Sequence, residues 1–171
     1  MRILGLDPGS RLLGYGVLER ERSGWRRLSS GVLRLKPNDP IPHRLAEAFT
    51  AVREIIQLHR PEHVAIEECF VAHSPRSALV LGQVRGVLLL AARLEETELH
   101  EFAPRSVKLA AVGNGGASKE QVQAMIPRLL GDCRSGLGAD EADALAVAWC
   151  CANQLRSPIV RPAGTLRGAA R

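Results

Sequence analysis

The order of the strand-like and helical segments is the feature that most constrains the fold of this chain. Three strand-like runs follow one another near the N-terminus, over residues 2–7, 12–21 and 25–36, with only short gaps between them. Short gaps favour antiparallel pairing, because strands that run in opposite directions need only a tight turn to connect them. The N-terminal part therefore predicts a three-stranded antiparallel meander.

The rest of the chain alternates between helical and strand-like segments. Apolar residues at helical spacing mark residues 40–61 and 74–96, and short apolar runs follow at 62–70 and 99–103. Strands separated by helices pair in parallel and are covered on both faces. Further helices are expected at residues 104–113, 118–130 and 138–156. The predicted fold is an α/β five-stranded mixed sheet, with three antiparallel strands, then parallel strands, and helices on both faces.

Length and composition favour one folded domain. The chain has 171 residues, of which 46% are hydrophobic, and this is enough to bury a core. We expect a domain over residues 1–156 and a basic, disordered tail over residues 157–171, where Pro, Gly and Arg occur without periodicity. No apolar run is long and clean enough to cross a bilayer, and no signal-peptide pattern follows Met1, so we expect a cytoplasmic protein.

The cysteines do not predict a metal site, whereas the charge predicts an anionic partner. The four cysteines form no Cys-x-x-Cys pair, and no His-x-His or Cys-x-His spacing accompanies them, so neither zinc nor a disulfide framework is expected. The net charge of +5 suits nucleic acid. Only three of the 23 basic residues are lysines: Lys36, Lys108 and Lys119.

Acidic residues stand at the ends of predicted elements. Asp7 ends the first strand, Glu67 and Glu68 follow the apolar residues of the fourth, and Asp140 and Asp143 lie in the first turn of the last helix. Singly, each has a structural explanation: a turn-forming Asp, a solvated strand end, or an acid that favours the helix dipole. Together they predict a cluster of carboxylates, whose mutual repulsion a hard divalent cation such as Mg²⁺ or Mn²⁺ relieves.

Five motifs resemble the RuvC family of Holliday-junction resolvases, which belongs to the ribonuclease-H-like superfamily. They are LGLDPGSRLLGYGV, AIEECF, SALVLGQVRG, APRSVKLAAVGNGGASKEQVQ and ADEADALAVA, in family order and at family spacing, over residues 1 to about 153. The resemblance implies an endonuclease that resolves four-way DNA junctions by paired symmetric nicks during homologous recombination and repair. It also implies a homodimer that works with the RuvA and RuvB branch-migration proteins.

The resemblance also implies the site residues. Asp7, Glu67, Asp140 and Asp143 would hold two Mg²⁺ ions, for which Mn²⁺ can substitute, and Lys119 would join them in catalysis. The family's usual Gln is replaced by Glu68; adjacent strand residues point to opposite faces, so only one of the two glutamates can face the metals, and the motif selects Glu67.

DNA contacts are expected from residues outside the carboxylate set. By resemblance, Phe70 would stack on an unpaired base, and Lys108, Lys119 and Arg76 would contact the DNA. Phe70 is equally suited to be a core anchor, and each lysine to be a solvated surface charge. Ser74 replaces the family's usual Asn; it is also a candidate N-cap, with Pro75 at the first helical position.

The helix over residues 74–96 is a candidate dimer contact. Its Gly82 and Gly86 are four residues apart and allow close helix approach, although the helix also fits a simple role in the core.

Two other functions fit part of the sequence. A non-cleaving DNA-junction-binding module would need the acids to be structural, and the presence of all four family acids opposes it. A sugar-kinase or actin-like ATP-binding protein would use DPGS after a strand as a phosphate loop. It would need further glycine-rich loops and a second domain, for which 171 residues leave little room.

Overall fold

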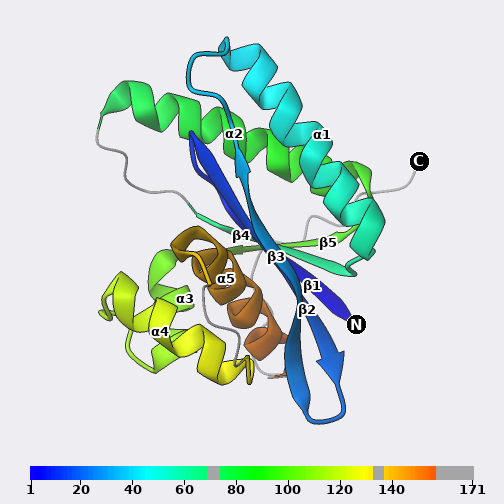
Figure 1. Ribbon diagram of the computed structural model, residues 1–171, viewed down its shortest axis with the longest axis vertical. Coiled ribbons are helices and arrows are strands. Elements are labelled where there is room, and N and C mark those ends of the chain that lie inside the picture. Colours follow the sequence, from blue (N-terminus) through cyan, green and yellow to red (C-terminus); the bar gives the residue numbers. More distant parts are fainter. Residues whose placement is uncertain (69–73, 133–136, 157–171) are drawn as a thin grey trace, which may run out of the picture.

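The computed structural model describes residues 1–68, 74–132 and 137–156, which form a sheet flanked by helices (Figure 1). The strand order is β3-β2-β1-β4-β5. The strands are β1 (Arg2–Asp7), β2 (Leu12–Glu21), β3 (Gly24–Arg34), β4 (His63–Glu67) and β5 (Glu98–Phe102). β1, β2 and β3 pair antiparallel, and β1-β4 and β4-β5 pair in parallel. The predicted α/β mixed sheet is confirmed; the proposed tail, residues 157–171, lies outside the described residues.

The neighbouring strands β1 and β4, both inside the sheet, are buried on both faces, as their near-continuous apolar sequence predicts. In β1, Leu4 and Leu6 belong to one hydrophobic core and Ile3 to the other. In β4, Val64 and Ile66 lie on the side of Leu4, and Ala65 lies on the side of Ile3. Because side chains alternate along a strand, the residues that follow, Asp7 and Glu67, both point to the side of Ile3 and Ala65.

Helices α1 (Ile41–His59) and α2 (Pro75–Leu94) cover the face of Leu4 and Leu6. The predicted start of α2 is confirmed: the Ser74 hydroxyl accepts a hydrogen bond from the Ser77 N–H at 3.2 Å, and Pro75 follows at the first helical position.

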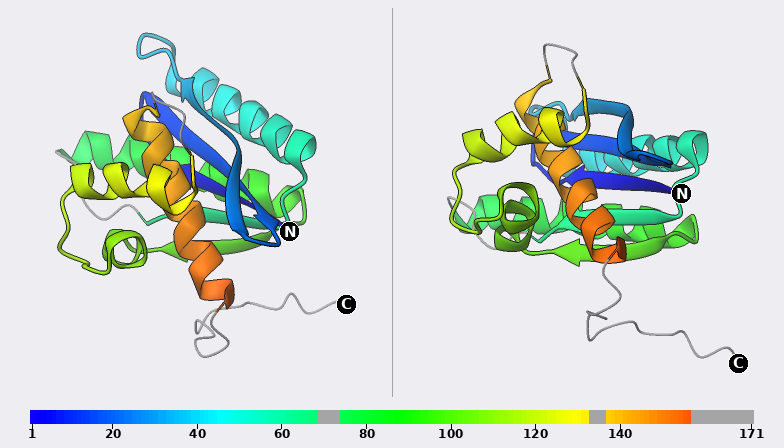
Figure 2. Two further views of the ribbon diagram at one scale, coloured as in Figure 1. Left: turned by 60° about the horizontal axis from the view of Figure 1, so that its bottom comes forward. Right: turned by 90° about the horizontal axis from the view of Figure 1, so that it is seen from below.

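The helix α5 (Ala139–Arg156) lies on the opposite face, with α3 (Pro104–Val112) and α4 (Lys119–Leu129) packed against it (Figure 2). Its backbone rests directly on glycines of the sheet. A Cβ atom at Gly5 would lie 2.1 Å from the Ala144 carbonyl oxygen, and one at Gly14 would lie 2.2 Å from the Asp140 carbonyl oxygen. Glycine is therefore required at both positions, and the close approach fixes the first turns of α5 above the ends of the strands.

By length and hydropathy, α2 is apolar enough to cross a membrane, in contrast to the expectation from the sequence. Only one side of this helix is buried, and it packs on the sheet through Val84 and Leu88. Three of its leucines are exposed: Leu79 (65%), Leu90 (52%) and Leu94 (56%). The helix α2 thus carries apolar residues both on the side that faces the core and on the exposed side.

The two cysteines of α5 behave as small core residues. Cys150 and Cys151 are buried and unpaired, and burial raises the pKa of each thiol to about 12. Both side chains thus pack as small hydrophobic residues of the core. Cys69 and Cys133 lie outside the described residues.

Candidate active site

The carboxyl ends of β1 and β4 form the floor of the candidate site. The two strands are parallel neighbours, with Leu6 paired to Ile66, so Asp7 and Glu67 follow at adjacent positions on the same edge. The sequence predicted a cluster of carboxylates from the acids at the ends of these elements. β4 ends at Glu67; the Glu68 N–H beyond it donates to the Phe102 carbonyl oxygen at 2.8 Å.

The first turn of α5 adds two further carboxylates. Asp140 and Asp143 are three residues apart and therefore share one side of the helix. Together with Asp7, each offers an oxygen atom, and these atoms all lie within 4.8 Å of one another. The chain thus brings three acids from two distant segments to one point.

The charges of these acids interact strongly. Burial, followed by the negative charges of Glu67, Asp143 and Asp140, raises the pKa of Asp7 to about 7. Burial and the Asp143 charge also raise the pKa of Glu67. All four predicted carboxylates therefore share one electrostatic environment, in which full ionisation is costly unless positive charge is nearby.

Lys119 supplies part of that positive charge. Its Nζ lies 2.5 Å from Asp143 Oδ2, and Ser118 holds it at the start of α4 through a capping box with Gln121. Burial opposes the charge of Lys119, but the carboxylates of Asp143, Asp7 and Asp140 outweigh it and raise the pKa of the lysine.

Two residues at the site were not predicted from the sequence. The side-chain amide of Gln123, one turn after Lys119 on α4, donates to Asp143 Oδ1 at 3.1 Å. Glu141 anchors α5: Ser30 of β3 donates to its Oε1 at 3.0 Å, and the Gly138 N–H donates to its Oε2 at 2.9 Å. Gln123 is four residues after Lys119, a spacing that places both on one side of a helix. Polar residues on a helix surface are too common, however, for this spacing to identify Gln123 from the sequence.

The remaining predicted residues lie in three different situations. Lys108, on α3, is close enough for its positive charge to offset part of the rise in the pKa of Glu67. Arg76 is exposed in the first turn of α2. Phe70 falls outside the described residues. The structure therefore brings Lys108 and Lys119 to the four acids.

Comparison with known proteins agrees with this arrangement. The sequence model of a family described as "Crossover junction endodeoxyribonuclease RuvC" matches residues 3–151. The chain belongs to the RuvC family. The RuvC protein of Solidesulfovibrio magneticus is 46% identical over 155 residues, which cover 90% of each chain.

Solved RuvC structures share the fold. The Thermus thermophilus RuvC structure superposes with a TM-score of 0.83 at 34% identity, covering 91% of this chain and 96% of that one. The same protein in complex with a Holliday junction substrate gives a TM-score of 0.81 at 31% identity and covers 91% and 96% of the two chains. The predicted family and the ribonuclease-H-like fold are thus confirmed. The chain is a crossover junction endodeoxyribonuclease. Its family acts on DNA and is not a family of membrane proteins. Nucleases of the RuvC family are metal-dependent, and the acidic cluster is of a kind that binds metal.

Proposed function

We propose that this chain resolves four-way DNA junctions by metal-dependent hydrolysis of phosphodiester bonds, during homologous recombination and DNA repair in the cytoplasm. The observation that carries the proposal is the convergence of Asp7, Asp140 and Asp143 within 4.8 Å, beside the electrostatically coupled Glu67. A structural role explains each acid singly, but it does not explain why four acids gather at a site where their repulsion raises pKa values.

The four carboxylates fit two Mg²⁺ ions. Carboxylate oxygens are the preferred ligands of this hard cation, and Mn²⁺ accepts the same ligands. The raised pKa of Asp7 supports the assignment, because a cluster that resists ionisation gains most from a bound cation. When bound, two ions about 3.5–4 Å apart would stabilise the attacking and leaving oxygens of an in-line displacement.

The protein's own side chains would hold this site in order. Gln123 donates to one oxygen of Asp143, and Lys119 lies beside the other, so the orientation of this carboxylate is set before DNA arrives. The Lys119 side chain remains 57% exposed, and its ammonium group is therefore free to approach a DNA phosphate as well.

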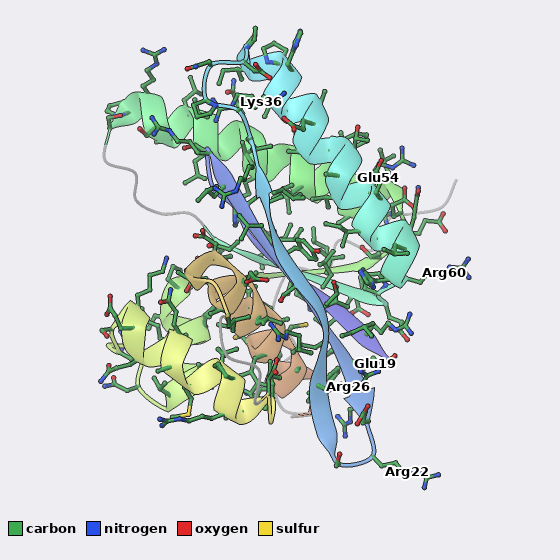
Figure 3. The ribbon with its side chains drawn as sticks, in the orientation of Figure 1. Glu19, Arg22, Arg26, Lys36, Glu54 and Arg60 are labelled. Atoms are coloured by element: carbon green, nitrogen blue, oxygen red, sulfur yellow. The ribbon has the colours of Figure 1, made fainter. Side chains whose placement is uncertain are left out.

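The DNA contacts that we propose centre on Lys108 and Lys119, with Arg76 and Phe70. Phosphate contacts from basic residues would orient the junction, and Phe70 would stack on an unpaired base. Some other basic residues are paired within the protein: Arg26 lies 2.5 Å from Glu19 on the β2–β3 hairpin, where Figure 3 shows the two side chains close together. Arg22, in contrast, points away from the hairpin tip.

A homodimer is the second part of the proposal. Leu79, Gly82, Gly86 and Leu90 are spaced by three or four residues and are exposed on α2, and a Cβ atom at either glycine would meet nothing within 4 Å. This surface suits a second copy of α2, because small residues allow two helices to approach closely. A two-fold dimer would present two equivalent sites to a two-fold junction and make symmetric nicks, and RuvA and RuvB would deliver the junction.

The central experiment is nicking of a synthetic four-way junction in Mg²⁺ by Asp7→Asn. The rate should fall by about 10³-fold or more, equivalent to about 4 kcal/mol, while junction binding persists, because the change removes charge without volume. Glu54→Gln, at an exposed position on α1 (Figure 3), is the matched control and should nick normally. Normal nicking by Asp7→Asn would disprove the four-carboxylate site, and wild-type protein that binds junctions without cutting them would support the non-cleaving alternative.

The dimer is tested separately. Sedimentation velocity at micromolar concentration should show a dimer, and end-labelled junctions should reveal cuts at symmetry-related positions. A strict monomer, or cuts at unrelated positions, would contradict this part of the proposal.

A further inference from the structure

A second group of side chains that could hold a metal ion lies at the start of β4 and β5, at the opposite end of these strands from the carboxylates. Parallel pairing of β4 with β5 places His63 opposite Glu98, and His100 follows two residues later on the same side of β5. His63 Nδ1 lies 3.1 Å from His100 Nε2. Glu98 offers Oε2 at 3.5 Å from His63 Nδ1 and Oε1 at 3.9 Å from His100 Nε2. Two imidazoles and a carboxylate thus point to one position.

We propose that His63, Glu98 and His100 form a second metal site, for a borderline divalent transition ion such as Zn²⁺. Tetrahedral Zn²⁺ holds nitrogen and oxygen ligands at about 2.0–2.1 Å, which separates the ligand atoms by about 3.3–3.4 Å. The two nitrogens lie 3.1 Å apart here, whereas the distances of 3.5 and 3.9 Å involve different oxygens of Glu98. One oxygen of this exposed carboxylate must turn toward both rings, and one candidate ligand atom from each of the three residues already lies within 4.8 Å of the others. The ligands therefore need only small side-chain movements to bind the ion.

The ligand chemistry distinguishes this site from the carboxylate site. Imidazole nitrogen suits Zn²⁺ and other late transition ions, whereas Mg²⁺ prefers an all-oxygen environment. His63 lies four residues before Glu67 on β4, which separates the two sites by about 13 Å at the usual rise of a strand. Each ion therefore has its own site.

Burial favours an ordered site with one open side. Each histidine side chain is only 12% exposed, whereas that of Glu98 is 64% exposed. The two rings are held by the surrounding protein, and the exposed carboxylate lies at the solvent side, next to the open position. Three protein ligands leave the fourth tetrahedral position to water.

The expected consequence is a stronger attachment of the edge strand. β5 is the last strand in the sheet and pairs with β4 along one side. An ion that binds the folded chain and bridges β4 to β5 would stabilise the native state by mass action. The sequence did not predict this site, because His63 and His100 are 37 positions apart and only strand pairing joins them.

The test is calorimetric titration of the metal-free, full-length protein with Zn²⁺ in the presence of excess Mg²⁺, combined with thermal unfolding. One ion should bind per chain and raise the melting temperature. His63→Asn with His100→Asn should weaken binding by at least about 100-fold, since loss of ligands costs no less than loss of their supporting groups. Because Glu98 is exposed, Glu98→Gln keeps the fold and should also weaken binding. Substitution with Co²⁺ should give a visible absorption spectrum typical of tetrahedral coordination.

Two controls locate the ion. His43→Gln, at an exposed histidine on α1, and Asp7→Asn, at the carboxylate site, should both bind Zn²⁺ like the wild type. The proposal is wrong if no Zn²⁺ binds in excess Mg²⁺, if the histidine variants bind it normally, or if Asp7→Asn alone abolishes binding. The last outcome would place the ion among the carboxylates.

Discussion

The helices α5 and α2 lie on opposite faces of the sheet, and the glycines associated with them have opposite surroundings. Beneath α5, the helix backbone occupies the space that a side chain at Gly5 or Gly14 would need. A Cβ atom at these positions would lie 2.1 and 2.2 Å, respectively, from a carbonyl oxygen of α5. On α2, Gly82 and Gly86 face open space. In the first case, glycine brings a helix close enough to place Asp140 beside Asp7. In the second, it leaves an exposed surface that a second copy can contact. The same residue type therefore serves the site on one face and, as we propose, assembly on the other.

The largest expected effect tests which face of β4 carries the chemistry. The Glu67 side chain points to the same face as Ala65, the face covered by α5, whereas Glu68 lies past the end of the strand. Glu67→Gln should therefore lower the nicking rate by about 10³-fold, as for any ligand of the metal pair. Glu68→Gln is the matched control and should retain most activity. Steady-state nicking of a four-way junction measures both, and a reversed result would assign the site to the other glutamate.

The second prediction compares the two kinds of glycine directly. Gly5→Ala should lower the free energy of unfolding by about 3 kcal/mol, because α5 must move away from the sheet. Gly86→Ala should leave the monomer unchanged or stabilise it by about 0.5–1 kcal/mol, since alanine is the better helix former. Urea unfolding at low protein concentration separates these effects from association.

Dimer formation should be affected in the opposite order by these two variants, with the larger effect from Gly86→Ala. Sedimentation should show weaker association for Gly86→Ala than for folded Gly5→Ala. If Gly5→Ala and Gly86→Ala destabilised the monomer equally, the surroundings of the two glycines would not differ as the structure indicates.

Most of the fold was predictable because its signals are local. The period of the apolar residues identified the strands and helices, and Ser74-Pro75 marked the start of α2. The order of the elements then determined which strands pair in parallel. The apolar content of α2 was underestimated, because Arg85 interrupts the run, yet the whole helix is long and apolar enough to span a membrane.

The site was predictable only where strand or helix ends carry acids. Asp7, Glu67, Asp140 and Asp143 stood out by position, and the resemblance assigned their roles. Gln123 and the pair His63 and His100 were missed, because their partners are distant in the sequence and only tertiary packing creates the contact.

A further prediction concerns the titration of Asp7 beneath α5. The pKa of Asp7 is about 7 in the folded, metal-free protein, against an ordinary value of 3.8. The folded state therefore holds this proton more tightly, and the stability that it contributes at low pH is lost as pH rises from about 4 through 7. At about 1.4 kcal/mol per pKa unit, the loss should be on the order of 4 kcal/mol in the presence of a chelator. Saturating Mg²⁺ should then raise the melting temperature more at pH 8 than at pH 5. Asp7→Asn should remove most of this pH dependence, and an unchanged slope in that variant would assign the effect to other groups.

The smallest effect tests whether Lys119 stabilises the fold or assists the reaction. Its ammonium group lies 2.5 Å from Asp143, but the side chain is 57% exposed, and an exposed ion pair contributes at most about 1 kcal/mol to stability. Lys119→Gln should therefore change the free energy of unfolding little, while lowering the nicking rate about tenfold, or about 1.4 kcal/mol in the barrier. Lys36→Gln, at an exposed lysine beyond β3 (Figure 3), should change neither quantity. Lys119→Arg keeps the positive charge and should recover part of the rate. A large loss of stability with normal nicking per folded molecule would instead make Lys119 a structural link between α4 and α5.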